Sequence, residues 1–224
     1  MNDVKEKIPN IIIKIKITRS ERIILVFVIL LGVFTLGSLL IIKNKCLFVK
    51  NYDPDDIQFN NRENIAVLNT NCGNVIIETY PDISPNAVER FKTLIRLGAY
   101  DDAAFHRVIE NKLIQAGDLE FGKKENLDYG KVGTGKSGLG LIKSEINADF
   151  EFKKGSVGLA RTFEMNTEDS QFFIILQDEP LFKGEYTPIG KVLYGIEVLE
   201  KVKFMTKFHI VPRPDFINSL KMLN

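Results

Sequence analysis

An unbroken apolar run near the N-terminus is the longest pattern in the chain. Residues 23–42 read IILVFVILLGVFTLGSLLII and contain no charged side chain. A helix of this length spans about 30 Å, which is the thickness of the hydrocarbon layer of a bilayer. A helix in the core of a soluble protein is usually shorter and carries a polar stripe. The run therefore predicts a membrane-spanning helix.

A cleaved signal peptide is the main alternative for this run. The apolar part of a signal peptide is usually about 7–15 residues long and leads to a cleavage site of small residues. This run is longer, a long tail precedes it, and residues 41–45 read IIKNK, which offers no such site. Asn44 and Lys45 before Cys46 do not fit a lipoprotein signal either. We therefore favour an uncleaved signal anchor.

The cations on either side of the run predict its orientation. They are Lys5, Lys7, Lys14, Lys16, Arg19 and Arg22 before it, and Lys43, Lys45 and Lys50 after it. Because Lys and Arg are in excess on the cytoplasmic side of membrane helices, we expect residues 1–22 to form a basic cytoplasmic tail. Residues 43–224 are then expected outside the cytoplasm. The abundance of Lys, Asn and Ile is typical of an AT-rich genome, and in a bacterium this space would be the periplasm.

The pattern changes after the apolar run. Residues 43–62 mix charged residues, Asn and Pro without any period, which is typical of a linker. From about residue 63, short apolar runs alternate with turn-forming residues, which predicts strands. The predicted strands are 65–69, 74–80, 104–109, 112–116, 156–160, 171–176 and 188–192.

Two segments have helical spacing instead. Ser84 suits the N-cap of a helix, and Pro85 suits its first position. The apolar face of this helix is formed by Val88, Phe91, Leu94 and Ile95. A shorter helix is predicted at 196–202. Many short strands with two helices predict a mainly β domain over residues 63–224, with a closed or sandwiched sheet and helices over its open ends.

Composition and charge exclude several classes of function. The formal net charge is +1, which leaves no basic surface typical of nucleic-acid binding. His106 and His209 are the only histidines, neither lies in an HExxH motif, and the chain has no GxSxG motif. Residues 133–137 end like a phosphate loop but lack its first glycine and the apolar strand before it. No metal, cofactor or nucleic acid is therefore expected.

The cysteines and the first histidine are interpreted as structural. Cys46 follows the apolar run and Cys72 lies in a predicted turn. They form neither a metal-binding pair nor a disulfide framework, so we expect two free thiols. His106, which has no relay partner in the sequence, is interpreted as a hydrogen-bonded structural residue rather than a catalytic base.

The segment 104–118, AFHRVIENKLIQAGD, places an arginine inside a strand-like run. If it forms a hairpin, loop length decides which residues face one another. A two-residue loop would put Arg107 opposite Ile114, whereas a three-residue loop would put it opposite Gln115. Asn111 tolerates positive φ, so both loops are feasible. Only the second register gathers Arg, Gln and apolar side chains on one face.

Two neighbouring phenylalanines, Phe172 and Phe173, lie in a later predicted strand. Because strand neighbours point to opposite faces, one of them belongs to the core. The other is then expected to face any groove on the far side of the sheet.

Six motifs, taken in order, resemble those of the cyclophilins, a family of peptidyl-prolyl cis–trans isomerases. They are FHRVI at 105–109, QAGD at 115–118, GTG at 133–135, LAR at 159–161, SQFFI at 170–174 and YTPIGKV at 186–192. The resemblance covers about residues 64–204 and extends to a closing strand near residue 222. It implies a closed eight-stranded antiparallel barrel capped by two helices. It also implies proline-containing polypeptides as substrates and no cofactor.

The resemblance implies a role for each matching position. Arg107 matches the catalytic arginine of the family, and Gln115 matches its neighbouring glutamine. The substrate-binding positions are Phe105, Lys112, Leu113, Ala160, Arg161, Thr162, Gln171, Phe173, Leu181, Phe182 and Tyr186. Lys112 stands where most members have a pocket phenylalanine, and it would bring a cation near Arg107. Leu181 stands at the position of a tryptophan often linked to cyclosporin affinity.

The leading hypothesis is a monomeric, membrane-anchored isomerase that accelerates X–Pro rotation in extracytoplasmic proteins. The alternative from another class is a proline-binding or scaffold module that kept the groove but lost catalytic activity because of Lys112. A third option is an assembly factor that works through its membrane helix. The apolar run contains no GxxxG motif and no charge, so the sequence indicates anchoring alone for it.

Overall fold

The computed structural model describes residues 18–43, 45–203 and 210–223. Most of the predicted basic tail and the whole of His209 lie outside these residues. The chain divides into two compact units, residues 1–45 and residues 46–224. Each unit is considered by itself below.

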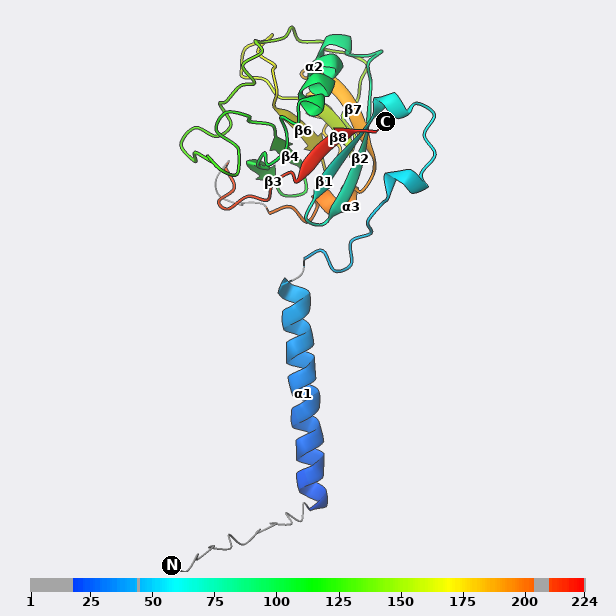
Figure 1. Cartoon of the computed structure of the whole chain (residues 1–224), viewed down its shortest axis with the longest axis vertical. Helices are drawn as coiled ribbons and strands as arrows, with labels where there is room; N and C mark the ends of the chain where they lie inside the picture. The colour runs from blue at the N-terminus through cyan, green and yellow to red at the C-terminus, as the bar shows by residue number, and fades with distance from the viewer. Residues whose placement is uncertain (1–17, 44, 204–209, 224) are drawn as a thin grey trace, which may run out of the picture. The chain divides into compact units, whose positions relative to one another are not determined.

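The first unit contains one long helix, α1 (Arg19–Lys43), which includes the predicted apolar run (Figure 1). Thr18 and Glu21 form a capping box at its start, in which Thr18 N donates to Glu21 Oε2 at 2.6 Å. Its stretch Arg19–Leu40 has a mean hydropathy of 2.9 and is not buried in the protein. The helix therefore has the length and composition of a signal sequence or a single membrane anchor.

The second unit is built on one eight-stranded antiparallel sheet, and the predicted strands are confirmed with small shifts at their ends. The strands are β1 (Ile65–Thr70), β2 (Gly73–Thr79), β3 (Arg107–Ile109), β4 (Leu113–Ala116), β5 (Ser156–Leu159), β6 (Phe172–Ile175), β7 (Pro188–Tyr194) and β8 (Ser219–Met222). Their order in the sheet is β3-β4-β6-β5-β7-β2-β1-β8. Figure 1 shows how strongly the sheet curls on itself.

The curled sheet is a half-barrel, and its ladder of strands is not the fully closed one that we expected. The strand order leaves β3 and β8 at the two edges, and β3 is only three residues long. The gap is bridged by the segments that precede these two strands. Phe105 N donates to Asp215 O at 2.9 Å, and Ile217 N donates to Ala103 O at 2.9 Å.

The two predicted helices are α2 (Pro85–Arg96) and α3 (Ile196–Leu199), which lie at opposite ends of the sheet in Figure 1. Ser84 occupies the N-cap position and Pro85 the first position of α2, as predicted, but the Ser84 side chain makes no capping hydrogen bond. The cap is the carboxylate of Glu145, which accepts from Asn86 N at 3.2 Å and Ala87 N at 2.9 Å. An anion is favoured at this place by the positive end of the helix dipole.

The main core lies between α2 and the inner face of the sheet. Phe172 packs there against Phe91 and Tyr100, with ring centroids 5.2 and 5.4 Å away. Phe173 belongs to a second, smaller cluster on the other face of the same strand. The prediction that these two phenylalanines serve opposite faces is therefore confirmed.

The segment from Cys46 to residue 62, expected to be part of a linker, packs along the β1–β2 hairpin. Asn74 N donates to the side chain of Asn51 at 2.9 Å, and the ring of Tyr52 lies 5.3 Å from that of Tyr194. This path brings Cys46 to the β1–β2 turn, where it forms a disulfide with Cys72. The expectation of two free thiols is wrong, because contacts made by aperiodic residues bring the two sulfurs together.

Candidate active site

The β3–β4 hairpin adopts the register with the three-residue loop. Arg107 pairs with Gln115 across the two strands, and Ile109 pairs with Leu113. Asn111, at the tip of the loop, has a φ of 55°, a conformation that Asn tolerates better than most residues. The hairpin therefore gathers the arginine, the glutamine and apolar groups on one face.

Arg107 is half-buried and is held from one side by Gln115. Arg107 Nη1 donates to Gln115 Oε1 at 3.2 Å, and Gln115 Nε2 donates in turn to Gln171 Oε1 at 2.9 Å. Burial lowers the pKa of Arg107, and the nearby Tyr186 phenol partly offsets this effect. An arginine pKa begins so high that the guanidinium stays charged at neutral pH. Gln115 accepts from one of the five N–H donors of Arg107. The guanidinium is therefore oriented and can still donate to a ligand.

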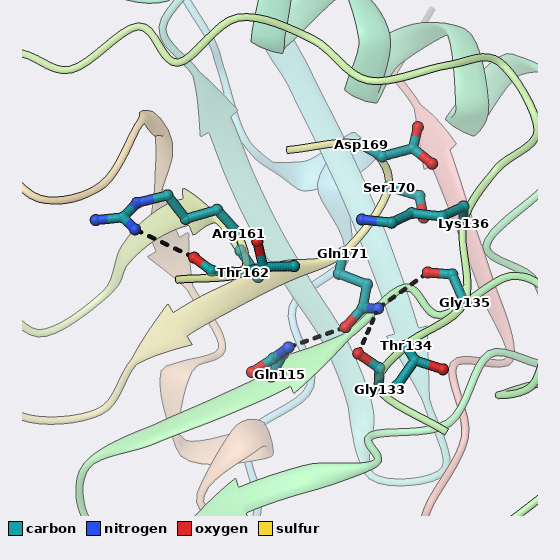
Figure 2. Close-up of a pocket in the computed structure, with 11 residues that line it drawn as sticks. Gln115, Gly133, Thr134, Gly135, Lys136, Arg161, Thr162, Asp169, Ser170 and Gln171 are labelled. Atoms are coloured by element: carbon teal, nitrogen blue, oxygen red, sulfur yellow. Dashed lines mark hydrogen bonds between the residues drawn. The ribbon is translucent and has the colours of Figure 1, made fainter. Parts of the chain in front are cut away.

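The chain of hydrogen bonds continues into the Gly133–Gly135 loop (Figure 2). Gln171 Nε2 donates to Gly133 O at 3.0 Å and to Gly135 O at 3.1 Å. From the other side, Asp118 Oδ2 accepts from Gly133 N at 2.7 Å and from Gly135 N at 2.9 Å. A Cβ at Gly135 would come within 2.1 Å of Asp118, so only glycine fits. The amides that would bind phosphate in a phosphate loop serve this carboxylate instead.

A cavity of about 200 Å³ opens beside this chain of hydrogen bonds (Figure 2). Its lining consists of Gln115, Gly133, Thr134, Gly135, Lys136, Ala160, Arg161, Thr162, Asp169, Ser170 and Gln171. It thus brings together five of the residues that the sequence places in the site: Gln115 on β4, Ala160, Arg161 and Thr162 directly after β5, and Gln171 directly before β6. The predicted groove positions Ala160–Thr162 and Gln171 lie side by side in its lining, because Ala160 N donates to Gln171 O at 2.8 Å.

An aromatic cluster forms the apolar part of the site. The ring of Phe173 lies 5.5 Å from Phe182 and 5.1 Å from Tyr186, and Leu113 packs in the same cluster. Sequence reasoning missed Phe152, which is buried behind Phe173 at 5.8 Å. The alternation of Phe150 and Phe152 was the available signal for it. The predicted pocket residues therefore come together around a ring that the motifs do not contain.

Two predicted substrate-binding residues, Phe105 and Leu181, lie in other surroundings. Phe105 is buried in the main core, so it is wrongly placed in the groove. It precedes the short strand β3, and the alternation that would give it the same face as Arg107 does not extend to it. Leu181 is 80% exposed on the turn η3 (Pro180–Phe182). Arg161, by contrast, lines the cavity, and its guanidinium lies 5.2 Å from the centroid of the ring of Tyr186, another predicted site residue.

Lys112 forms an ion pair with Glu179, with its Nζ 2.7 Å from Glu179 Oε2. The lysine side chain is 44% exposed, whereas that of Glu179 is only 11% exposed. Glu179 N also donates to Phe152 O at 2.8 Å, and Glu179 directly precedes η3, which carries Phe182. The lysine that replaces the family's apolar wall therefore neutralises a largely buried carboxylate beside the aromatic cluster.

We expect Lys112→Phe, which restores the usual family residue, to destabilise this protein rather than improve it. Glu179 would keep a largely buried carboxylate without its cation, a loss of about 1–2 kcal/mol in the free energy of unfolding. Urea unfolding measures the loss, and isomerase activity is expected not to rise. The matched control adds Glu179→Gln to Lys112→Phe and should recover most of the stability. A single Lys112→Phe variant as stable as wild type would contradict this role of the pair.

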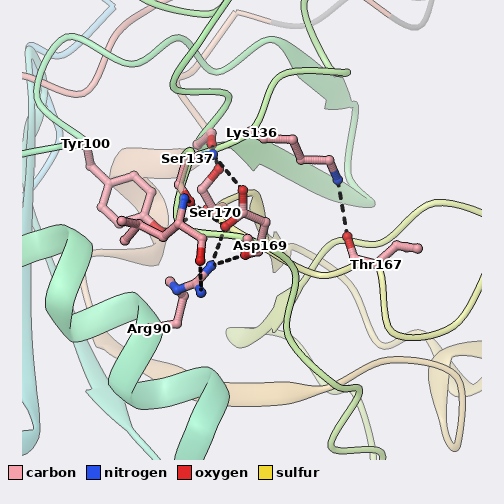
Figure 3. Close-up of polar contacts among 10 residues, drawn as sticks. Arg90, Tyr100, Lys136, Ser137, Thr167, Asp169 and Ser170 are labelled. Atoms are coloured by element: carbon pink, nitrogen blue, oxygen red, sulfur yellow. Dashed lines mark hydrogen bonds and ion pairs between the residues drawn. The ribbon is translucent and has the colours of Figure 1, made fainter.

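The start of β6 is fixed by a polar network under α2, which the sequence did not indicate (Figure 3). Asp169 is buried and accepts from Arg90 and from Ser137 N, the latter at 2.5 Å. Tyr100 Oη donates to Ser170 O at 2.8 Å. These bonds hold the residues that immediately precede Gln171, and they therefore fix where its side chain enters the cavity.

His106 lies inside the protein and is 2% exposed. Burial lowers its pKa to about 4, so the imidazole is neutral at pH 7. Among the residues that the structure describes, no group of three or more His, Cys, Asp or Glu side chains could hold a metal ion. The candidate site therefore combines a half-buried guanidinium, two side-chain amides and an apolar cluster in which Leu113 and Phe173 are buried.

A curled antiparallel half-barrel with this Arg–Gln–Gln chain beside an aromatic cluster defines a cyclophilin-like protein. Residues 65–219 match the family described as cyclophilin type peptidyl-prolyl cis-trans isomerase/CLD. A probable peptidyl-prolyl cis-trans isomerase of Brucella abortus (strain 2308) is 40% identical over 142 residues, which are 63% of this chain and 72% of that protein. Peptidyl-prolyl cis-trans isomerase B of Escherichia coli (strain K12) is 31% identical over 147 residues, or 62% of this chain and 84% of that protein.

The solved structures agree with the sequence relatives. A crystal structure of a Cryptosporidium parvum cyclophilin type isomerase in the presence of the dipeptide Ala-Pro has a TM-score of 0.61 and 27% identity. The match covers 70% of this chain and 98% of that one. This chain therefore belongs to the cyclophilin-type peptidyl-prolyl cis-trans isomerase family. It is an enzyme of that class, and its substrates are proline-containing peptides.

Proposed function

We propose that this chain is a membrane-anchored isomerase that accelerates X–Pro rotation in proteins outside the cytoplasm, with Arg107 as the catalytic residue. The observation that carries the proposal is the half-buried guanidinium of Arg107, oriented by Gln115 on the face that carries the apolar pocket. Its action assists the folding of client proteins. The enzyme works as a monomer and needs no cofactor.

The residue types suit a reaction in which no bond breaks. Rotation about an X–Pro bond has a barrier of roughly 20 kcal/mol, which comes from amide resonance. In the twisted state, the proline nitrogen becomes pyramidal and regains a lone pair. A guanidinium that donates to this nitrogen binds the twisted amide better than the planar one, and such differential binding lowers the barrier.

The other site residues hold the substrate while the amide turns. Leu113, Phe173 and Phe182 receive the proline ring, because they form the apolar cluster next to the hairpin. The backbone of residues 160–162 holds the residue before proline, and Gln171 lines the same cavity next to Ala160. Gln115 acts through Arg107 and is a positioning residue.

The anchor and the compartment belong to the same proposal. Helix α1 has the length and hydropathy of a membrane span, and the six cations before its apolar run, against three after it, support a cytoplasmic N-terminus. The Cys46–Cys72 disulfide supports an extracytoplasmic, oxidising space, which is the periplasm in a bacterium. The isomerase domain then includes residues 63–224 together with the segment from Cys46, which packs on it.

The second candidate function is a proline-binding or scaffold module without isomerase activity. The observation that favours it is the Lys112–Glu179 ion pair, which stands in place of an apolar wall. A protease-coupled assay on the full chain in detergent, with a proline tetrapeptide, separates the two. We expect clear acceleration of cis–trans conversion. Peptide binding without acceleration would identify the module.

The anchor is tested separately, in intact cells. Mass spectrometry of the purified protein should find the N-terminal tail still attached to the mature chain. Added protease should reach the isomerase domain once the outer barrier is opened, and should leave the tail protected. A mature chain that begins after residue 42 would replace the anchor with a cleaved signal sequence.

A further inference from the structure

Leu47 and Phe48 form an exposed apolar pair immediately after the disulfide cysteine. Leu47 is 50% exposed and Phe48 is 82% exposed. They lie between two lysines, Lys45 and Lys50, in a segment that otherwise contacts the β1–β2 hairpin. A single exposed apolar side chain is common on a protein surface, but two adjacent ones so close in the chain to a predicted membrane helix suggest a contact outside the protein.

The turn that presents this pair is held in place by the domain. Cys46 is bonded to Cys72, and Val49 N donates to Cys46 O at 3.0 Å. Val49 itself packs against the main core. The two apolar side chains therefore lie on a fixed turn, with Cys46 held by the disulfide on one side and Val49 packed on the core on the other. A fixed turn lowers the entropy cost of binding.

The length of chain between α1 and the pair limits where the pair can lie. Helix α1 ends at Lys43, and Phe48 follows five residues later. An extended chain covers about 3.5 Å per residue, so Phe48 lies within roughly 17 Å of the helix end. The polar interfacial layer of a bilayer is about 5–8 Å thick on each side. A chain whose α1 spans a membrane thus keeps this pair close to that layer.

The chemistry of the pair fits this layer. Aromatic side chains are enriched at the membrane–water interface, and lysines are attracted there by anionic lipids. The exposed Lys50 lies with its Nζ 4.6 Å from the centroid of the Tyr52 ring, so a cation and a second aromatic residue accompany the pair. A cluster of this composition is typical of an interfacial anchor.

We propose that Leu47 and Phe48 insert into the interfacial layer of the bilayer that contains α1, with Lys50 at the lipid headgroups. This inference rests on the proposed membrane anchor. The Cys46–Cys72 bond then connects the lipid-bound turn directly to the β1–β2 hairpin. The disulfide therefore keeps the isomerase domain at the membrane surface. A free linker of residues 43–62 would instead let the domain move away from it.

The chain contains no tryptophan, so a single introduced tryptophan reports on its own surroundings. The full chain is reconstituted into vesicles of neutral and anionic phospholipid, with and without brominated acyl chains. Three variants are compared: Phe48→Trp in the turn, Phe163→Trp on a loop of the isomerase domain, and Phe34→Trp within α1. Phe163 is the matched control, because it is 95% exposed in the same domain.

We expect the Phe48→Trp variant to show blue-shifted emission and several-fold stronger quenching by brominated lipid than the Phe163→Trp variant. Equal, red-shifted and unquenched emission from these two variants would overturn the inference and leave the anchor intact, provided that Phe34→Trp is quenched. A blue shift at Phe48→Trp without quenching would also overturn it, in favour of a protein partner or a second copy. An unquenched Phe34→Trp variant would overturn the anchor itself, and this inference with it.

Discussion

Arg107→Ala is expected to reduce kcat/KM on a proline-containing tetrapeptide by about ten- to a hundredfold. A hydrogen bond to a charged group has a net value of about 1.5–3 kcal/mol, and each 1.4 kcal/mol changes a rate about tenfold. The bond proposed from the guanidinium to the pyramidal proline nitrogen exists only in the twisted state. Its loss should therefore lower kcat more than it raises KM. A protease-coupled assay on the full chain measures both parameters.

The matched control for this variant is Arg96→Ala. Arg96 lies in the last turn of α2, is exposed, and pairs with Glu89 at 2.9 Å on the surface. The same substitution there should leave kcat/KM unchanged. Both variants should unfold at nearly the wild-type urea concentration, because Arg107 contributes one side-chain bond, to Gln115. Wild-type activity in Arg107→Ala would reject the arginine mechanism, and an equal loss in Arg96→Ala would show that the effect is not local.

The β3–β4 hairpin was predictable because its determinants are local. Arg107 and Gln115 are eight residues apart, and the loop between them admits only two registers. One of these registers gathers compatible side chains, and it is the one observed. Likewise, strand alternation alone separates Phe172 from Phe173. Local periodicity therefore recovered most strands and the polar face of the candidate site.

The features that the sequence did not reveal all depend on partners far along the chain. Glu145 caps α2 from 58 residues beyond Ala87, and Asp169 binds Arg90 across 79 residues. Glu179, the partner of Lys112, is another such case. None of these carboxylates follows a periodic pattern that would identify its partner. Their positions are fixed by loops whose paths depend on the completed sheet.

The error at Phe105 has a different origin, because there the local pattern was extended too far. Alternation assumes a regular strand, and β3 begins only at Arg107. The backbone at Phe105 instead bonds to Asp215 and closes the gap between the sheet edges. Its side chain consequently enters the core. A family motif marks a conserved position, but the position can serve the fold rather than the substrate.

Replacing both cysteines, in Cys46→Ser/Cys72→Ser, is expected to lower the free energy of unfolding by about 3–4 kcal/mol. The disulfide joins residues 26 positions apart, and closing a loop of that length removes this much chain entropy from the unfolded state. Removal of the disulfide should therefore lower stability and leave isomerase activity almost unchanged. Residues 51 and 52 keep their own bonds to Asn74, and the candidate site lies on other strands, so kcat/KM at 25 °C should stay near wild type.

Urea unfolding of the full chain in detergent, with and without a thiol reductant, measures this effect. Reductant should shift the wild-type transition to the position of the double variant, and it should not shift the double variant itself. The second result is the control, because it excludes an effect of reductant on other groups. Identical wild-type transitions in both conditions would mean that the cysteines are not joined in the folded enzyme. The disulfide would then no longer support an oxidising compartment, and the turn that carries Leu47 and Phe48 would lose its covalent tie to the isomerase domain.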